Sequence, residues 1–353
     1  MPVAALLFDA ASTMRARPIG LVAALLVVTV ATRSAAQTPA SAPGIGRIER
    51  LDPAFDALVP LSARIEKLAD GFDWSEGPVW RKSGGYLLFS DIPKNTIHRW
   101  SEGQGISIYL RPAGYAGAAP QGRELGSNGL TLDASDRLVM ADHGNRQIAR
   151  VNDSLATKTV LADRYEGKRL NSPNDLVYHP NGDLYFTDPP YGLAGINSSK
   201  DKELSFNGVY RLRPNGELLL LTKELTFPNG IAISPDGRTL YVNISDASNP
   251  RMMAYDIDAA GISHGRVFFD AAPLVAKGRI GSLDGMKVDR NGNLFATGPG
   301  GVLVITPQGK LLGSILTGER TANVAFGDDG STLYLTADHK LLRIRTSTRG
   351  LGF

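Results

Sequence analysis

The sequence predicts an all-β protein that folds as a six-bladed β-propeller. After residue 62, short runs of β-branched and aromatic residues alternate with Asn-Gly, Asp-Gly and Pro turns, and helical spacing of apolar residues is hard to find. A second observation is a pattern that occurs six times, in which a residue with a side-chain oxygen opens a short apolar run. The openings lie 39 to 55 residues apart, and units of about 40 to 50 residues with four strands each are typical of propellers. The six opening residues are Glu76, Asn128, Asn174, Asn229, Asp284 and Asn323.

Residues 1–36 have the layout of a secretory signal peptide. Two arginines precede an apolar run over residues 19–31, and small residues then offer a cleavage site before Gln37. Met14 is a better start than Met1, because the residues before it carry an acidic side chain and no basic one. The apolar run is shorter than the ~20 residues that span a bilayer. We therefore expect a periplasmic or secreted protein with no stable membrane insertion after cleavage.

The composition of the chain excludes several kinds of partner and chemistry. The formal net charge is +3, and no basic stripe with interleaved aromatic residues occurs, so we expect no nucleic-acid partner. The chain has no Cys, which excludes disulfides, thiolate catalysis and Cys-ligated zinc. Residues 37–62 are expected to form a linker and N-terminal extension exposed on the surface, and residues 63–353 the propeller. The oligomeric state is left open.

The strands of one blade can be placed from the sequence. In the third repeat we expect strands over residues 174–178, 183–187, 208–213 and 217–222. The run 64–69 precedes the first repeat and has no blade of its own. We expect it to supply the outer strand of the last blade, next to residues 340–345, which would close the ring.

The six opening residues predict a metal site. The innermost strand of each blade lines the central channel, so residues that open these strands converge at one mouth. Carboxylates and amide carbonyls without His or Cys are the ligands of a hard divalent cation such as Ca²⁺ or Mg²⁺. The alternative is that an Asn only caps a tight turn, which we prefer for Asn323. That alternative is weaker for Glu76 and Asp284, because burying two like charges is costly unless a cation neutralises them.

Other polar groups are expected at the same mouth. The turn after the second strand of each blade returns to it, which places His143 and Tyr191 there, and the connection that contains Arg169 enters the third blade from the same side. For His143, a turn residue bonded to Asp142 and a catalytic group both remain open. No nucleophile-elbow motif and no Gly-rich phosphate loop occur, which argues against a serine hydrolase and against a nucleotide-binding enzyme.

Five motifs resemble the family of gluconolactonases, regucalcins and luciferin-regenerating enzymes. They occur in one order at blade spacing, and the resemblance covers roughly residues 51–350. The motifs are Glu76–Trp80, Asn171–Leu176, Phe186–Gly192, Pro228–Ala232 and Asp284–Met286.

The resemblance implies a metal-dependent lactonase. It makes Glu76, Asn229 and Asp284 direct ligands of one divalent ion, Asn174 a fourth ligand or the holder of a bound water or substrate, and places Asn128 near the substrate. We expect Ca²⁺ first, with Mg²⁺, Mn²⁺ or Zn²⁺ as alternatives. The ion would polarise the lactone carbonyl and stabilise the developing oxyanion while water attacks. Asp284 would orient or deprotonate that water, and His143 is the second candidate.

The expected substrate is a small polar sugar lactone such as gluconolactone. Asn128, Asn174, Arg169 and Tyr191 could bond several hydroxyl groups of an aldonolactone, and export fits sugar oxidation outside the cytoplasm. Two other classes remain open. One is a metal-binding propeller without catalysis, since a fold alone implies no function. The other is an arylesterase or phosphotriesterase that resembles the paraoxonases.

Overall fold

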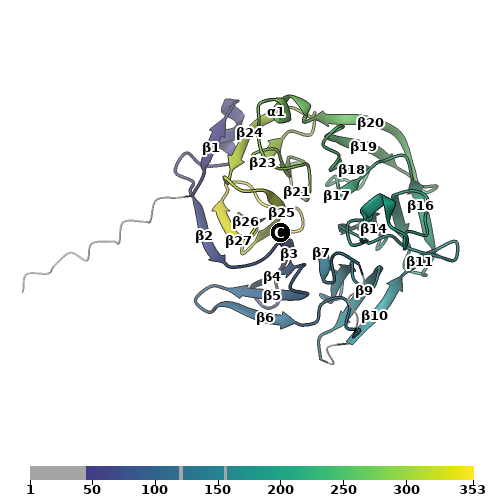
Figure 1. The fold of residues 1–353 in the computed structure, drawn as a ribbon. Coiled ribbons are helices and arrows are strands. Elements are labelled where there is room, and N and C mark those ends of the chain that lie inside the picture. Colours follow the sequence, from purple (N-terminus) through teal and green to yellow (C-terminus); the bar gives the residue numbers. More distant parts are fainter. Residues whose placement is uncertain (1–44, 119–121, 155–156) are drawn as a thin grey trace, which may run out of the picture. The chain divides into compact units, whose positions relative to one another are not determined.

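Six antiparallel sheets form a ring around a central channel, as Figure 1 shows down the channel. The computed structural model describes residues 45–353 except 119–121 and 155–156. The signal-peptide expectation for residues 1–36 lies outside the described residues. The ring confirms the predicted six-bladed β-propeller.

Blades one to five each contain four strands that follow one another in the chain, with the first strand innermost, whereas blade six contains three such strands and a fourth that comes from before blade one. Blades one to three contain β3 (Ser75–Arg81), β4 (Tyr86–Asp91), β5 (Thr96–Ser101), β6 (Gly105–Leu110); β7 (Ser127–Leu132), β8 (Leu138–Asp142), β9 (Gln147–Asn152), β10 (Thr157–Ala162); and β13 (Leu176–Tyr178), β14 (Leu184–Asp188), β15 (Gly208–Leu212), β16 (Leu218–Thr222). Blades four to six contain β17 (Pro228–Ile233), β18 (Thr239–Ile244), β19 (Arg251–Ile257), β20 (Ile262–Asp270); β21 (Met286–Val288), β22 (Leu294–Gly298), β23 (Gly301–Ile305), β24 (Leu311–Leu316); and β25 (Thr321–Gly327), β26 (Thr332–Ala337), β27 (Lys340–Arg345).

The ring closes through a strand from before the first blade. β2 (Ile65–Asp70) pairs antiparallel with β27 and becomes the outer strand of blade six, with Ile65 opposite Ile344. This pairing confirms the predicted closure. Next along the chain, the backbone N–H and the hydroxyl of Ser75 both donate to the carbonyl oxygen of Asp338, each at 2.8 Å. Blade one is therefore fastened to blade six at the channel mouth.

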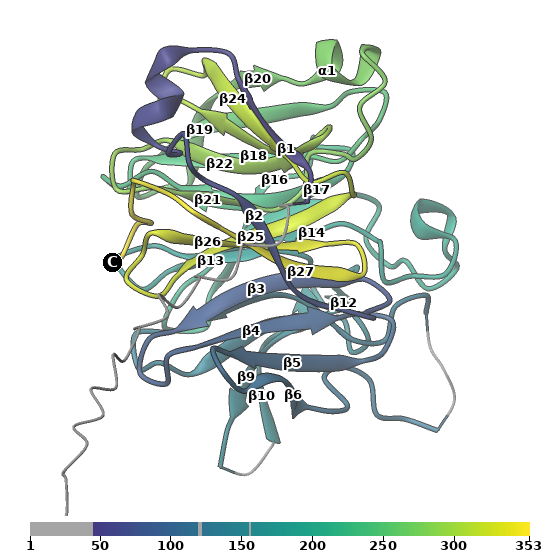
Figure 2. The same ribbon diagram turned by 90° about the vertical axis from the view of Figure 1, so that its left-hand side faces the viewer.

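Residues 47–59 differ from the exposed linker expected over 37–62. β1 (Arg47–Arg50) adds a fifth strand to blade five by pairing with β24, and the 3₁₀ helix η1 (Pro53–Ala57) follows it (Figure 2). Phe55 is fully buried in an apolar cluster shared by blades five and six. The side chain of Arg50 donates to the carbonyl oxygen of Pro60 at 2.7 Å, which ties the chain after η1 back to β1. Burial of apolar side chains therefore ties this segment to the propeller.

Apolar side chains fill the spaces between neighbouring blades. Between blades one and six, the rings of Trp80 and Tyr334 stack with centroids 5.4 Å apart, and Phe295 meets Phe326 edge-on between blades five and six. Outside the blades, the structure describes a short hairpin of β11 (Arg164–Tyr165) and β12 (Lys168–Arg169), the 3₁₀ helix η2 (Ile196–Ser198) and the helix α1 (Ala272–Ala276). Within this described part of the chain, no helix has the length and apolar character needed to cross a membrane.

Candidate metal centre and active site

A repeated hydrogen bond defines one layer of residues at the channel mouth. In four blades, a polar side chain near the end of the second strand donates to the backbone carbonyl of the residue that opens the next blade. The four bonds are Ser90 to Asn128 at 2.8 Å, Thr187 to Asn229 at 2.7 Å, Asn243 to Asp284 at 2.5 Å and Thr297 to Ala322 at 2.9 Å. These bonds place Asn128, Asn229 and Asp284 in one layer, as the sequence predicted.

The same bonds correct the sixth position, which belongs to Ala322 and not to Asn323. The carbonyl of Asn323 accepts from the Thr336 hydroxyl at 3.2 Å, just as the carbonyl of Gly285 accepts from Thr297 at 3.0 Å. Asn323 therefore lies one residue deeper, level with the residue after Asp284. Its amide donates to the Glu76 carboxylate at 3.3 Å and its side-chain oxygen accepts the next backbone N–H at 2.9 Å. Asn323 is thus a support for Glu76, and only five opening residues carry a side-chain oxygen.

Asp175 is a third channel carboxylate that the sequence analysis did not select. It follows Asn174 directly, and its carbonyl pairs with Thr187 as that of Gly285 pairs with Thr297. It therefore lies in the deeper layer with Asn323. Asp175 and Glu76 each expose only 2% of their surface, whereas Asp284 is partly exposed.

Without a cation, ionisation of the three carboxylic groups in the channel is unfavourable. Burial, and next the charge of Asp175, raises the pKa of Glu76 to about 8. Burial and the charges of Glu76 and Asp175 raise the pKa of Asp284 well above its ordinary value. Burial also raises the pKa of Asp175, against a smaller opposing effect of the Lys287 charge. Among the described residues, no Lys, Arg or His forms an ion pair with any of the three.

The residues at the mouth fit a hard divalent cation. The side-chain amide of Asn229 donates to the Ser245 hydroxyl at 2.8 Å, and its buried oxygen has no hydrogen-bond partner. One carboxylate oxygen of Asp175 is also buried without a partner. Partnerless buried oxygens beside uncompensated carboxylates are the donor set that Ca²⁺ or Mg²⁺ requires. The residues that would hold the ion are Glu76, Asn174, Asn229 and Asp284, with Asn174 only 3% exposed.

His143 lies in the turn between β8 and β9 and is bonded on both ring nitrogens. Its Nδ1 lies 2.8 Å from the Glu124 carboxylate, and its Nε2 lies 3.3 Å from the side-chain nitrogen of Asn128. Its side chain is fully buried. The turn residue Asp142 bonds instead to Asn145, Gln147 and Lys158. The interpretation of His143 as a residue held by Asp142 is therefore wrong.

Tyr191 and Arg169 differ in how closely they approach the centre. The Tyr191 ring stacks on Phe227 with centroids 5.6 Å apart. Burial first, and then the nearby charge of Asp284, raises the pKa of its hydroxyl, while a hydrogen bond with Ser245 lowers it. The guanidinium of Arg169 donates to the carbonyl of Asn145 at 3.0 Å and so lies beside the turn that carries His143. Tyr191 is therefore at the centre and Arg169 at its rim.

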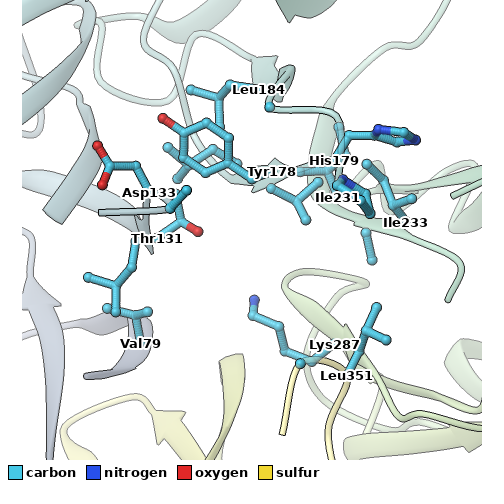
Figure 3. A pocket seen from close by; sticks show the side chains of 18 of the residues that line it. Val79, Thr131, Asp133, Tyr178, His179, Leu184, Ile231, Ile233, Lys287 and Leu351 are labelled. Atoms are coloured by element: carbon cyan, nitrogen blue, oxygen red, sulfur yellow. The ribbon is translucent and has the colours of Figure 1, made fainter. Parts of the chain in front are cut away.

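A cavity of about 1150 Å³ opens at the opposite end of the channel. Figure 3 shows its wall of apolar side chains, such as Val79, Ile231 and Ile233, with the amino group of Lys287 pointing into the open space. Val79 and Ile233 lie toward the far ends of strands whose first residues carry the channel-mouth oxygens. This cavity and the carboxylate centre are thus on opposite sides of the propeller.

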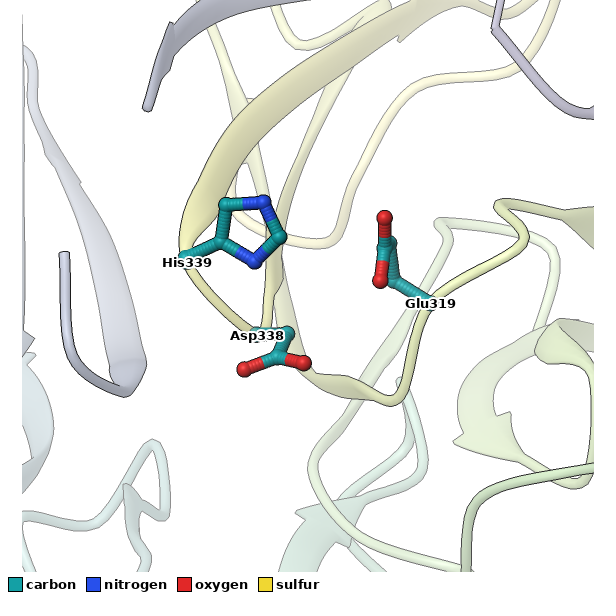
Figure 4. Close-up of side chains that lie close together, drawn as sticks. All are labelled: Glu319, Asp338 and His339. Atoms are coloured by element: carbon teal, nitrogen blue, oxygen red, sulfur yellow. The ribbon is translucent and has the colours of Figure 1, made fainter. Parts of the chain in front are cut away.

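A second group of possible ligands lies on blade six. Glu319, Asp338 and His339 bring ligand atoms within 4.8 Å of one another (Figure 4). All three are half-buried, and the Glu319 carboxylate already forms an ion pair with Lys340. The channel carboxylates have no such cation among the described residues. The channel centre therefore has the stronger requirement for a metal ion.

Comparison with known proteins agrees with this geometry. Residues 74–339 match the family described as the SMP-30/gluconolactonase/LRE-like region. A gluconolactonase from Zymomonas mobilis is 41% identical over 345 residues, which cover 94% of this chain and 95% of that protein. The diisopropyl-fluorophosphatase of Loligo vulgaris is 22% identical over 76% of this chain and 87% of its own. A solved gluconolactonase from Xanthomonas campestris superimposes with a TM-score of 0.76 at 31% identity, over 88% of this chain and 99% of that one. With the six-bladed ring and the oxygen-lined channel mouth, these matches show that the chain belongs to the SMP-30/gluconolactonase/LRE-like family.

Proposed function

We propose that this protein is a metal-dependent lactonase that hydrolyses a sugar lactone, an aldonolactone such as gluconolactone, to the acid. The observation that carries the proposal is the channel mouth, which holds three carboxylates without an ion-pair partner among the described residues and the partnerless side-chain oxygen of Asn229. Membership of a family that contains a gluconolactonase 41% identical to this chain supports the choice of substrate class.

The chain's own residues supply binding and proton transfer. Glu76, Asn174, Asn229 and Asp284 would hold the ion, which supplies a Lewis acid for the lactone carbonyl. Asp284 is the carboxylate of the three that solvent reaches, so a water molecule can approach it. Asp284 takes a proton from that water while the oxygen of the water bonds to the carbonyl carbon. The ring C–O bond then breaks, and the leaving ring oxygen takes up a proton.

His143 is the second candidate for the base. Its Nε2 faces Asn128 at the mouth, and Glu124 holds the opposite edge of the ring. Asn128 and Tyr191 offer an amide and a hydroxyl to the hydroxyl groups of the substrate, and Arg169 could bind a part of it that reaches the rim. A sugar lactone produced outside the cytoplasm would fit the proposed export of the chain.

The test compares three substrate classes with and without metal. Hydrolysis of gluconolactone, phenyl acetate and an organophosphate triester is measured after chelation and after return of Ca²⁺, Mg²⁺, Mn²⁺ or Zn²⁺. We expect the lactone to be preferred, chelation to abolish activity, and each ion to restore it to a different degree. Preference for the triester would favour the phosphotriesterase alternative, and preference for phenyl acetate the arylesterase alternative. Sugar-lactone hydrolysis no faster than in buffer, or full activity after thorough chelation, would contradict the proposal.

Two variants assign the metal to one group of residues. Asp284→Asn removes a charge from the channel centre and is expected to reduce ion affinity and turnover at least tenfold, in line with about 1.4 kcal/mol per factor of ten. Glu319→Gln removes a charge from the blade-six group and is expected to leave both unchanged. The reverse result would move the metal site to blade six.

A further inference from the structure

Three residues from separate parts of blade two form one chain of contacts that ends in the channel. Glu124 precedes β7, Asn128 lies within β7, and His143 follows β8. The contacts are 2.8 Å from Glu124 to His143 Nδ1 and 3.3 Å from His143 Nε2 to the Asn128 side-chain nitrogen. Asn128 is 4% exposed and His143 is 1% exposed.

The first contact fixes the direction of the second. An ionised carboxylate can only accept hydrogen bonds, so Nδ1 of His143 must carry a proton that it donates to Glu124. The neutral ring then has an unprotonated Nε2, which can only accept. Asn128 must therefore turn its NH₂ group toward His143. Its side-chain oxygen is left facing away, and no hydrogen bond to that oxygen occurs within the described residues.

The neighbourhood of the His143 ring favours this arrangement. Gly192 approaches so closely that a Cβ at that position would lie 3.1 Å from the Cβ of His143, which leaves the ring little room to turn. The backbone N–H of Gly192 is itself held by the Ser172 hydroxyl at 2.8 Å. Backbone bonds from Arg123 to the carbonyl of Gly192 at 2.8 Å attach the Glu124 segment to the same loop. The ring is therefore clamped between two connections.

We propose that Glu124 is a positioning residue that acts through His143 to make Asn128 present its amide oxygen, and not its NH₂ group, to the substrate. This inference deepens the proposed lactonase function and rests on it for the identity of the ligand. An amide oxygen accepts hydrogen bonds from hydroxyl groups. Glu124 thus determines specificity for substrates that carry hydroxyl groups, without touching them.

The tautomer can be read without any activity. In protein labelled with ¹⁵N at histidine and supplied with Ca²⁺, the side-chain nitrogen shifts of His143 distinguish a protonated Nδ1 from a protonated Nε2. The signal is assigned from its loss in His143→Gln. We expect protonation on Nδ1 alone at neutral pH in the wild type and a mixture of tautomers in Glu124→Gln, because a Gln amide can donate as well as accept. A ring protonated on Nε2 in the wild type, or an unchanged tautomer in the variant, overturns the proposal.

Kinetics then separate positioning from proton transfer. For a polyhydroxylated lactone, Glu124→Gln is expected to raise KM about five- to tenfold with little change in kcat, the size expected for about one neutral hydrogen bond. For a simple lactone without hydroxyl groups, KM should not change. A fall in kcat at constant KM for both substrates would instead show that Glu124 serves a catalytic base, and would overturn the role assigned to Asn128.

Asp256→Asn is the matched control. Asp256 forms a similar carboxylate–histidine contact of 3.0 Å with His264, but on the exposed surface of blade four. Its removal should alter neither the His143 tautomer nor KM. If the wild type turned over neither lactone, the proposed function would fail, while the nitrogen shifts would still decide whether Glu124 fixes His143.

Discussion

Replacing Glu76 with Gln should stabilise the metal-free protein, and increasingly so as the pH rises. The pKa of Glu76 is about 8 in the folded chain, against an ordinary value of 4.5 that describes the unfolded chain. Below 4.5 both states are protonated and the group has no effect on the free energy of unfolding. Between 4.5 and 8 the unfolded state has lost its proton while the folded state retains it, so stability falls with rising pH. Above 8 the full penalty is present.

The size of the effect follows from the shift. A difference of one pKa unit is worth about 1.4 kcal/mol, so the shift of Glu76 corresponds to a ceiling of about 5 kcal/mol above pH 8. Glu76 is 2% exposed, so solvent screens this charge little. A neutral Gln at the same position avoids the penalty. A bound cation opposes this advantage of the variant, because an ion at 100 times its dissociation constant stabilises the wild type by about 2.7 kcal/mol.

Urea unfolding from pH 5 to 9, in chelator and then with excess Ca²⁺, tests this prediction. In chelator the variant should gain stability over the wild type as pH rises, and with excess Ca²⁺ this advantage should shrink. Glu224→Gln, which removes an exposed carboxylate from the segment after β16, is the control and should show neither trend. A stability difference in chelator that does not change with pH would refute the reasoning.

Three further predictions concern the scaffold and the chain's beginning. Gly230→Ala should lower stability by about 1–3 kcal/mol and weaken ion binding in calorimetric titration, because a Cβ there would lie 2.0 Å from the carbonyl oxygen of Asp284; unchanged affinity would contradict this. Phe55→Ala should cost about 3–5 kcal/mol in urea unfolding, whereas the control Leu61→Ala, at a residue 74% exposed, should cost little; equal losses would show that η1 does not stabilise the propeller. The mature protein should begin near Gln37 and be found outside the cytoplasm, and N-terminal sequencing from the native host that recovers an uncleaved cytosolic chain would refute this.

The fold and most of the channel layer could be predicted because each blade repeats one local solution. An opening residue followed by Gly lets the backbone of one blade approach the carbonyl of the residue that opens the next blade, as at Gly77, Gly129 and Gly230. Sequence spacing alone reveals that solution. Blade six has Ala322 and Asn323 in place of this pair, so the marker is missing there. The hydrogen bonds from Thr297 to Ala322 and from Thr336 to Asn323 show that the register is one residue off.

The residues that the sequence analysis did not find depend on contacts that do not follow the repeat of the blades. Glu124 lies in a connection between blades, and only the folded loop brings it to His143. Asp175 adjoins a predicted ligand, but the repeated pattern marks only the opening residue of each blade and not the residue after it. β1 is a short charged segment whose strand conformation depends on pairing with β24, far along the chain. Such long-range pairing overrides local propensity.

Because β2 closes the ring, we expect the channel mouth to form late in folding. Ile65 must find Ile344, near the other end of the chain, before blade six is complete and Ser75 can reach Asp338. Contacts so distant in sequence are the slowest to form. Glu76 follows this seam directly, so it meets Asp284 in its final geometry only when both ends of the propeller have joined. Removal of β27 is therefore expected to abolish ion binding although it deletes no ligand. Conversely, a bound ion would stabilise the closed ring relative to the open one.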